Sequence, residues 1–204
     1  MPKGWDGVIS RKINRRFSRP IAHFLAKHTK VTPNQVSVVS FLIGGLSGLS
    51  FVLNQPILGG VLAQLTSIID GVDGDLAVIT GRTSPFGGFL DSVLDRYSDF
   101  FILFGMSYSF LLVSGWNMES LLVIVAALFG SLMVSYSRAR AESDLGVVFR
   151  SGFSGYAANR DIRLFIIMLT AILNQIQASL IILAVLTNLV VAKRVYDAKK
   201  VSGG

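Results

Sequence analysis

The sequence contains no cysteine and has few charged residues. Without cysteine, the chain of 204 residues can form no disulfide bond and has no thiolate for chemistry. Charged residues make up 15% of the chain and hydrophobic residues 51%, whereas about a quarter of the residues in soluble domains are charged. The composition therefore predicts a membrane protein, and the length predicts a single domain covering residues 1–204.

The first 30 residues are basic and carry apolar side chains at helical spacing. These apolar positions are Ile9, Ile13, Phe17, Ile21, Phe24 and Leu25, and arginine and lysine fill the gaps between them. Such a pattern is typical of an amphipathic helix that lies on an anionic membrane surface. Pro20 is expected to break or bend this helix.

Residues 31–198 contain six apolar segments separated by short polar turns. The predicted spans cover residues 33–53, 57–80, 86–114, 119–140, 161–173 and 178–195. A membrane-spanning helix needs about 20 residues, and Thr32 with Pro33 provides a cap and a first turn for the first span. The predicted fold class is all-α: a bundle of six transmembrane helices preceded by a cytoplasmic amphipathic helix.

All 19 lysine and arginine residues lie before the first span, in the second and fourth turns with their flanks, or after the last span. The other three turns carry none. The positive-inside rule therefore predicts an integral membrane protein with both termini and the basic turns in the cytoplasm. Nucleic-acid binding would not produce this one-sided distribution, so the net charge of +7 indicates a membrane surface.

The second and third spans carry carboxylates, which cost about 2.5–3.5 kcal/mol each at the centre of a membrane helix. They are Asp70, Asp73, Asp75, Asp91, Asp95 and Asp99. Asp70 and Asp73 share one helix face, and Asp91 and Asp95 share another. Because the two spans are antiparallel neighbours joined by a tight turn, these four carboxylates are expected to point into one cleft.

Carboxylates this close together would disfavour each other's ionisation unless cations bind between them. Oxygen ligands without cysteine or a suitable histidine pair favour Mg²⁺ or Mn²⁺. A divalent-cation transporter could use the same residues, but all of the carboxylates lie in the predicted cytoplasmic half. A purely structural scaffold would leave these carboxylates without a purpose. Gly44, Gly45 and Gly48 in the first span are interpreted as helix-packing positions.

The acidic residues follow a motif that resembles the CDP-alcohol phosphotransferase family. That motif is Asp-x-x-Asp-Gly-x-x-Ala-Arg, eight residues, then Gly-x-x-x-Asp-x-x-x-Asp. Here Asp70, Asp73, Gly74, Ala77, Gly87, Asp91 and Asp95 occupy seven of the eight fixed positions with the same spacings. The family arginine is replaced by Val78, and Arg82, about one helical turn further on, is a candidate to supply its charge.

The resemblance implies a metal-dependent enzyme that transfers a phosphoalcohol group from a CDP-alcohol donor to an acceptor alcohol and releases CMP. Asp70, Asp73, Asp91 and Asp95 would hold two ions of Mg²⁺ or Mn²⁺, and Asp95 would also be the general base. Gly74, Ala77, Arg82 and Gly87 would bind the CDP group. The family further implies a homodimer in the lipid bilayer.

Arginines at the end of the fourth span and the start of the fifth indicate which acceptor the enzyme uses. The run Arg138-Ala-Arg-Ala-Glu resembles the phosphatidylinositol-phosphate synthase branch, whose acceptor is inositol phosphate. The form Arg160-Asp-Ile-Arg163-Leu-Phe is closer to di-myo-inositol-phosphate-phosphate synthases, which use CDP-inositol. The predicted acceptor site consists of Arg138, Arg160, Arg163 and a basic residue late in the last span, Arg194 or Lys193. The alternative to an acceptor site is that single arginines contact lipid headgroups at the membrane surface.

The sequence is compatible with two kinds of donor, a CDP-linked glycerolipid and CDP-inositol. Enzymes that use CDP-inositol often carry a fused cytidylyltransferase domain, and this sequence contains none. We therefore expect a lipid donor or a separate partner.

Overall fold

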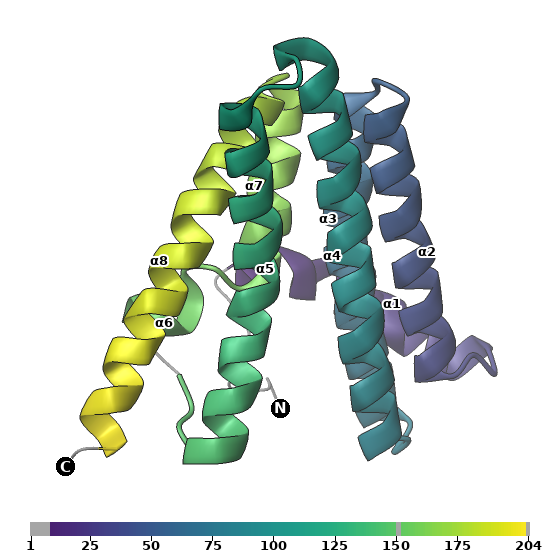
Figure 1. The fold of residues 1–204 in the computed structure, drawn as a ribbon. Coiled ribbons are helices and arrows are strands. Elements are labelled where there is room, and N and C mark those ends of the chain that lie inside the picture. The colour runs from purple at the N-terminus through teal and green to yellow at the C-terminus, as the bar shows by residue number, and fades with distance from the viewer. Residues whose placement is uncertain (1–8, 150–151, 203–204) are drawn as a thin grey trace.

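The computed structural model describes residues 9–149 and 152–202, and every regular element in those ranges is a helix (Figure 1). A π-helical turn at Ser10–Asn14 leads into the first helix. The helices are α1 (Arg15–His28), α2 (Pro33–Val52), α3 (Pro56–Ile79), α4 (Pro85–Ser114), α5 (Met118–Leu145), α6 (Gly152–Tyr156), α7 (Arg160–Ile172) and α8 (Ile176–Ser202). The all-α prediction is confirmed for the described residues, and α6 is a short helix that the sequence did not indicate.

Four helices are long and apolar enough to cross a membrane: Pro33–Val52, Pro85–Ser114, Met118–Leu145 and Ile176–Val201. The helices at the other two predicted spans, α3 and α7, are not among these four, for separate reasons. α3 has 24 residues but carries Asp70, Asp73 and Asp75 near its end. α7 has 13 residues, and a helix of that length is only about 20 Å long.

Local sequence determines where the long helices begin. Thr32 and Gln35 form a reciprocal capping box at the start of α2. The backbone N–H of Gln35 donates to Thr32 Oγ1 at 3.4 Å, and the backbone N–H of Thr32 donates to Gln35 Oε1 at 2.9 Å. Proline follows the cap in α2, α3 and α4, where its missing N–H costs nothing. The predicted start of the first span is therefore confirmed.

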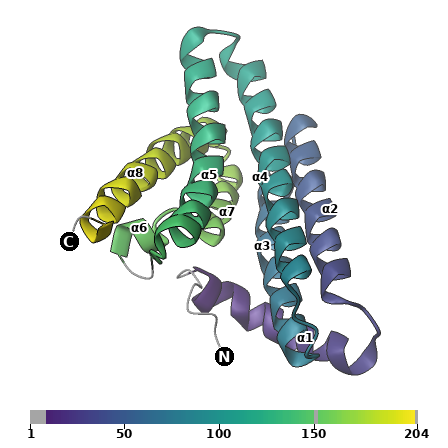
Figure 2. The ribbon, with the colours of Figure 1, turned by 60° about the horizontal axis from the view of Figure 1, so that its bottom comes forward.

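The helices form two groups that diverge toward one end of the molecule (Figures 1 and 2). α2 packs on α3 and α4, α5 packs on α8, and α7 joins the groups through α3. A β-carbon at Gly44 would meet the Ser98 side chain at 1.9 Å, and one at Gly48 would meet the Phe101 carbonyl at 2.3 Å. These two glycines thus pack against α4 as expected, whereas Gly45 faces open space.

Apolar side chains fill the half of the bundle away from the acidic residues. The main cluster includes Phe51, Ile102, Met106, Leu180 and Leu183, each fully buried. On α4 these positions follow the last aspartate, so one helix serves the core with its C-terminal half and the polar region with its N-terminal half.

α1 runs across the bundle rather than along it (Figure 2). Asn14 and Ser18, in the turn before α1 and in its first turns, are buried, while Phe17 and Phe24 are more than half exposed. This two-faced character agrees with the predicted amphipathic helix. Pro20 does not end the helix, which continues to His28. The π-helical turn runs into α1 without a break, so Pro20 lies inside a continuous helix and its missing N–H removes one intrahelical hydrogen bond.

Candidate active site

Three carboxylates from two helices meet between α3 and α4. Asp70, Asp91 and Asp95 each place one carboxylate oxygen within 4.8 Å of the others. Asp70 comes from α3, whereas Asp91 and Asp95 lie one turn apart on α4. The predicted convergence of the carboxylates is therefore present in the structure. The expectation that α3 and α4 are packed neighbours is wrong, because both helices pack on α2 rather than closely on each other.

Asp73, the fourth predicted metal ligand, lies at the edge of this cluster. Its side chain is 6% exposed and accepts a short hydrogen bond from the Ser37 hydroxyl of α2. It also contacts the Asp91 carboxyl group. Ser37 thus orients Asp73 toward α4.

The chemistry of the cluster fits a divalent cation. The candidate ligands are all carboxylate oxygens, which are the ligands that Mg²⁺ and Mn²⁺ prefer. They come from rigid helices and are packed more closely than like charges would otherwise allow. Asp70, Asp91 and Asp95 are the residues best arranged to hold such an ion, with Asp73 beside them.

A small pocket of about 110 Å³ lies at the turn between α3 and α4. We call it the turn pocket. It is lined by all four predicted CDP-binding residues, Gly74, Ala77, Arg82 and Gly87, and by Asp73 and Asp91. A β-carbon at Gly87 would lie 3.0 Å from Ser84 Oγ and 3.1 Å from Asn34 Oδ1, so a larger residue would crowd the pocket.

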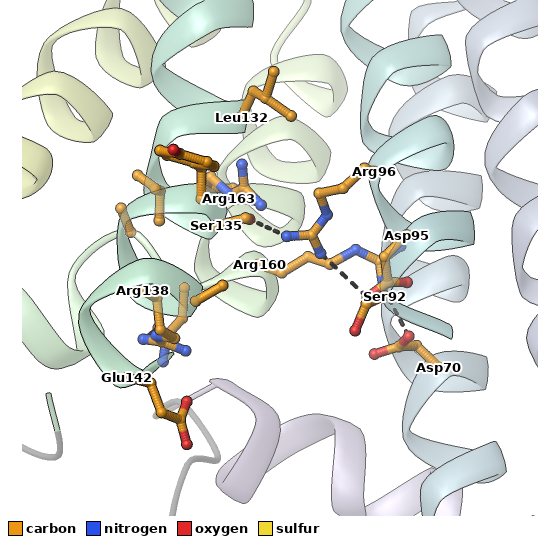
Figure 3. Close-up of a pocket in the computed structure, with 15 residues that line it drawn as sticks. Asp70, Ser92, Asp95, Arg96, Leu132, Ser135, Arg138, Glu142, Arg160 and Arg163 are labelled. Carbon is orange, nitrogen blue, oxygen red and sulfur yellow. Dashed lines mark hydrogen bonds and ion pairs between the residues drawn. The ribbon is translucent and has the colours of Figure 1, made fainter. Parts of the chain in front are cut away.

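A larger cavity of about 510 Å³ opens on the other side of the carboxylates, between α4, α5 and α7 (Figure 3). We call it the central cavity. Asp70 and Asp95 form one wall, and Arg138 and Glu142 of α5 lie opposite them (Figure 3). Its charged lining comprises Asp70, Asp95, Glu142, Arg96, Arg138, Arg160 and Arg163. A lining richer in arginine than in carboxylate suits an anionic ligand.

Two of the predicted acceptor-binding arginines contact the acidic helices directly. Arg160 Nη1 lies 2.9 Å from Asp70 Oδ1 and 2.8 Å from Asp95 Oδ1. Arg160 Nε donates to Asp99 Oδ1 at 2.9 Å, and Arg163 Nη2 donates to Asp99 Oδ2 at 2.7 Å.

Arg138 and Arg96 complete the arginine lining. Arg138 Nη2 donates to the Gly155 carbonyl at 2.8 Å and to Asn159 Oδ1 at 2.5 Å. Arg96 forms a short hydrogen bond with Ser135 and an ion pair of 3.3 Å with Asp95. These contacts fix side chains from α4 and α5 around the same cavity.

Arg194, the remaining predicted acceptor residue, has a different position. It is 1% exposed and is not among the residues that line the central cavity. It donates to the Ser154 carbonyl at 2.8 Å and to the Val134 carbonyl. Arg194 therefore ties α8 to α5 and α6 in this structure, and Lys193 pairs with Asp197 at the exposed end of α8. Acceptor binding by Arg194 stays a prediction.

Several residues of the site were not among the predicted site residues, although Asp99 was noted as a carboxylate within a span. Asp99, Ser37 and Asn159 contact predicted site residues, and Ser135 contacts Arg96, which was itself not predicted. All of these pairs are far apart in the chain. Only Asp99 had a signal, because it continues the four-residue step of Asp91 and Asp95. The other contacts depend on which helices are neighbours.

The fold has a counterpart among solved structures. The chain superposes on the crystal structure of Mycobacterium tuberculosis phosphatidylinositol phosphate synthase PgsA1 with CDP-DAG bound with a TM-score of 0.75. The match covers 90% of this chain and 94% of that one at 24% sequence identity, so it is a likeness of fold.

Curated relatives show stronger sequence similarity. A bifunctional IPC transferase and DIPP synthase of Aquifex aeolicus is 41% identical over 97% of this chain, which spans 45% of that relative's length. An archaetidylinositol phosphate synthase of Pyrococcus horikoshii is 39% identical over 83% of this chain and 85% of the relative. The model of the CDP-alcohol phosphatidyltransferase family matches residues 30–191. The chain therefore belongs to the CDP-alcohol phosphatidyltransferase family.

Proposed function

We propose that this chain transfers a phosphoalcohol group from a CDP-alcohol to a hydroxyl of inositol phosphate and releases CMP. The observation that carries the proposal is the position of the carboxylates between two pockets. Asp73 and Asp91 line the turn pocket, and Asp70 and Asp95 line the central cavity. Asp70, Asp91 and Asp95 each place a carboxylate oxygen in the same cluster between the two pockets. A CDP group in the turn pocket would have its pyrophosphate at the carboxylates and its alcohol side toward the arginines.

In the proposed step, the acceptor oxygen forms a bond to the phosphorus that carries the donor alcohol. The bond from that phosphorus to the bridging pyrophosphate oxygen breaks, and this oxygen leaves with CMP. Asp95 takes the hydroxyl proton, because its carboxylate lines the cavity where the acceptor binds. Arg160 and Arg96 flank Asp95 and hold its oxygens in place.

Asp70, Asp73, Asp91 and Asp95 are the proposed ligands for Mg²⁺ or Mn²⁺, with two ions per site. Bound there, the metal would neutralise charge on the pyrophosphate and on the leaving phosphate. The donor set of carboxylate oxygens supports this assignment.

The arginines of the central cavity are the proposed contacts for the acceptor's phosphate. Guanidinium groups bind phosphate in a forked geometry, and Arg138, Arg160 and Arg163 all line this cavity. The functions of two relatives, IPC transferase with DIPP synthase and archaetidylinositol phosphate synthase, favour an inositol-containing substrate.

The proposed setting is a bilayer crossed six times, with both termini and the active site on the cytoplasmic side and two chains forming a homodimer. The distribution of basic residues supports this orientation. A cation transporter, the alternative from the sequence, has no support from the family match or from the two relatives with named functions.

The test is CMP release by the purified chain in the presence of Mg²⁺. CDP-diacylglycerol, CDP-archaeol and CDP-inositol are supplied in turn, each with and without inositol 1-phosphate. We expect release only when a donor and inositol 1-phosphate are both present, loss on addition of EDTA, and recovery with Mg²⁺ or Mn²⁺. The active donor distinguishes a lipid from a soluble substrate. Release of no CMP from any pair would contradict the proposed acceptor, and absent donor binding would contradict the proposed reaction.

A further inference from the structure

Asp99 is a buried carboxylate that the proposed chemistry does not use. It lies one turn beyond Asp95 on α4 and is 8% exposed. It is not one of the three carboxylates whose oxygens cluster at the candidate metal site. A charged side chain in this position is costly unless it is paired and hydrogen-bonded, so its partners indicate its role.

Both oxygens of Asp99 are taken by arginines of α7. Oδ1 accepts from Arg160 Nε at 2.9 Å, and Oδ2 accepts from Arg163 Nη2 at 2.7 Å. Asp95 also pairs both of its oxygens with arginines, but it belongs to the group of carboxylates whose oxygens cluster at the candidate metal site, and Asp99 does not. Asp99 therefore differs in role from Asp70, Asp91 and Asp95, although it continues the four-residue step of Asp91 and Asp95 on α4.

The contact with Asp99 determines how each guanidinium group faces the central cavity. With its Nε held by Asp99, Arg160 directs Nη1 to Asp70 and Asp95. Arg163 is held at two points, by Asp99 and by the Ser131 carbonyl at 2.9 Å. A guanidinium group is planar, so fixing one or two of its nitrogens fixes the directions of the others.

Each arginine keeps a buried nitrogen without a protein acceptor. Within the described residues, Arg160 Nη2 and Arg163 Nε have no hydrogen-bond partner, and both side chains line the central cavity. Their side chains are 11% and 4% exposed. Buried charged donors of this kind are expensive when unsatisfied, so their placement points to an anionic ligand that enters the cavity.

We propose that Asp99 is a positioning residue, which holds Arg160 and Arg163 so that their free N–H groups bind the phosphate of the acceptor beside the reacting hydroxyl. The inference rests on the proposed transferase function and adds a residue outside the family motif. Without the Asp99 carboxylate, two neighbouring guanidinium groups would repel each other and lose their shared anchor. Arg160 would then be free to move further onto Asp70 and Asp95.

The test compares steady-state kinetics of Asp99→Asn and the wild-type chain, with CMP release as the readout. Asparagine has nearly the same shape, but its amide N–H₂ would face an arginine donor. We expect the KM for inositol 1-phosphate to rise at least about tenfold, as expected for lost charge-assisted hydrogen bonds. The KM for the CDP donor should change less than about threefold.

Two further variants distinguish positioning from general structural damage. Asp99→Glu keeps the charge and should recover part of the acceptor affinity, which also carries the test if Asp99→Asn does not fold. Asp144→Asn is the matched control, because Asp144 pairs with Arg140 at 2.6 Å at the exposed end of α5, outside the central cavity. It should leave both KM values unchanged.

Three results would overturn the inference. An active Asp99→Asn variant with an unchanged acceptor KM would show that Asp99 does not position the arginines. Equal increases in both KM values, with a lower melting temperature and no recovery in Asp99→Glu, would show a structural role. A wild-type chain that releases no CMP with any substrate pair would overturn the proposed function, and this inference with it.

Discussion

At the scale of single residues, the site combines side chains of opposite charge in a region where neither is stable alone. Asp95 shows this most clearly, because it lies between the carboxylates Asp70 and Asp91 and the guanidinium groups of Arg96 and Arg160. Such an arrangement holds the carboxylate in a fixed direction without covering the cavity in front of it. A general base needs both properties.

We predict that Asp95→Asn lowers kcat by about 10²–10⁴-fold, the range typical of general acid–base catalysis. Asparagine keeps the shape of the side chain but cannot take the hydroxyl proton at neutral pH. CMP release by the purified variant would measure the effect, with a melting curve to show that the chain is folded. A folded variant with kcat near that of the wild type would contradict the role of base.

We predict that Arg82→Ala raises the KM for the CDP donor roughly tenfold, because one charge-assisted contact to phosphate is lost. Arg82 lines the turn pocket with Asp73 and Asp91, whereas Val78, at the family arginine position, is not among its lining residues. Arg140→Ala is the control, since Arg140 lies at the exposed end of α5 and pairs with Asp144. Unchanged donor affinity in Arg82→Ala would mean that Arg82 does not replace the family arginine.

At the scale of helices, the sequence was sufficient to predict which residues share a face, but not how helices distant in the chain are arranged around them. The three- and four-residue steps of Asp70, Asp73, Asp91 and Asp95 indicated one cluster, because α3 and α4 are joined by a short turn. The pairing of Asp99 with Arg163 depends on where α7 lies relative to α4. The contact of Arg194 with the Val134 carbonyl depends on how α8 packs on α5. No local pattern specifies such contacts between distant segments.

The same reasoning explains how α1 is attached. Asp75 was grouped with the other carboxylates, but it faces α1 rather than α4. Its carboxylate accepts from Arg15 at 2.5 Å and from the Ser18 hydroxyl at 3.0 Å. Nearby, Asn14 donates to Ser67 Oγ at 2.8 Å and accepts from Gln64 at 2.8 Å. These polar contacts hold the amphipathic helix against the segment of α3 that carries Asp70 and Asp73.

We predict that Asp75→Asn loosens α1 by roughly 1–2 kcal/mol, because the Arg15 and Ser18 bonds weaken and the pair is partly solvated. Limited trypsin digestion of the protein in lipid nanodiscs would measure this as cleavage within α1 that is about 5- to 30-fold faster. Asp197→Asn, which removes an exposed ion pair of α8, should leave cleavage in α1 unchanged. Equal cleavage rates in α1 for Asp75→Asn and the wild type would show that the pair does not anchor the helix.

At the scale of the whole molecule, the charged residues and the candidate active site lie toward the same end of the bundle. The carboxylates, the central cavity and α1 lie toward one end, and the main apolar cluster lies in the other half. The turns at the other end, near Gln55, Asn117 and Gln175, carry no lysine or arginine. If the positive-inside rule sets the orientation, the cavity opens toward the cytoplasm, where nucleotide-linked donors are available.

The absence of native cysteine makes this orientation directly measurable. We predict that Gln55→Cys and Gln175→Cys react with a membrane-impermeant maleimide in intact cells, because both positions are exposed in turns at the non-basic end. Ser143→Cys, exposed near the end of α5, should react only after the membrane is permeabilised. The wild-type chain is the control for background labelling. Labelling of Ser143→Cys in intact cells, with protection of the other two, would place the active site on the opposite side of the membrane.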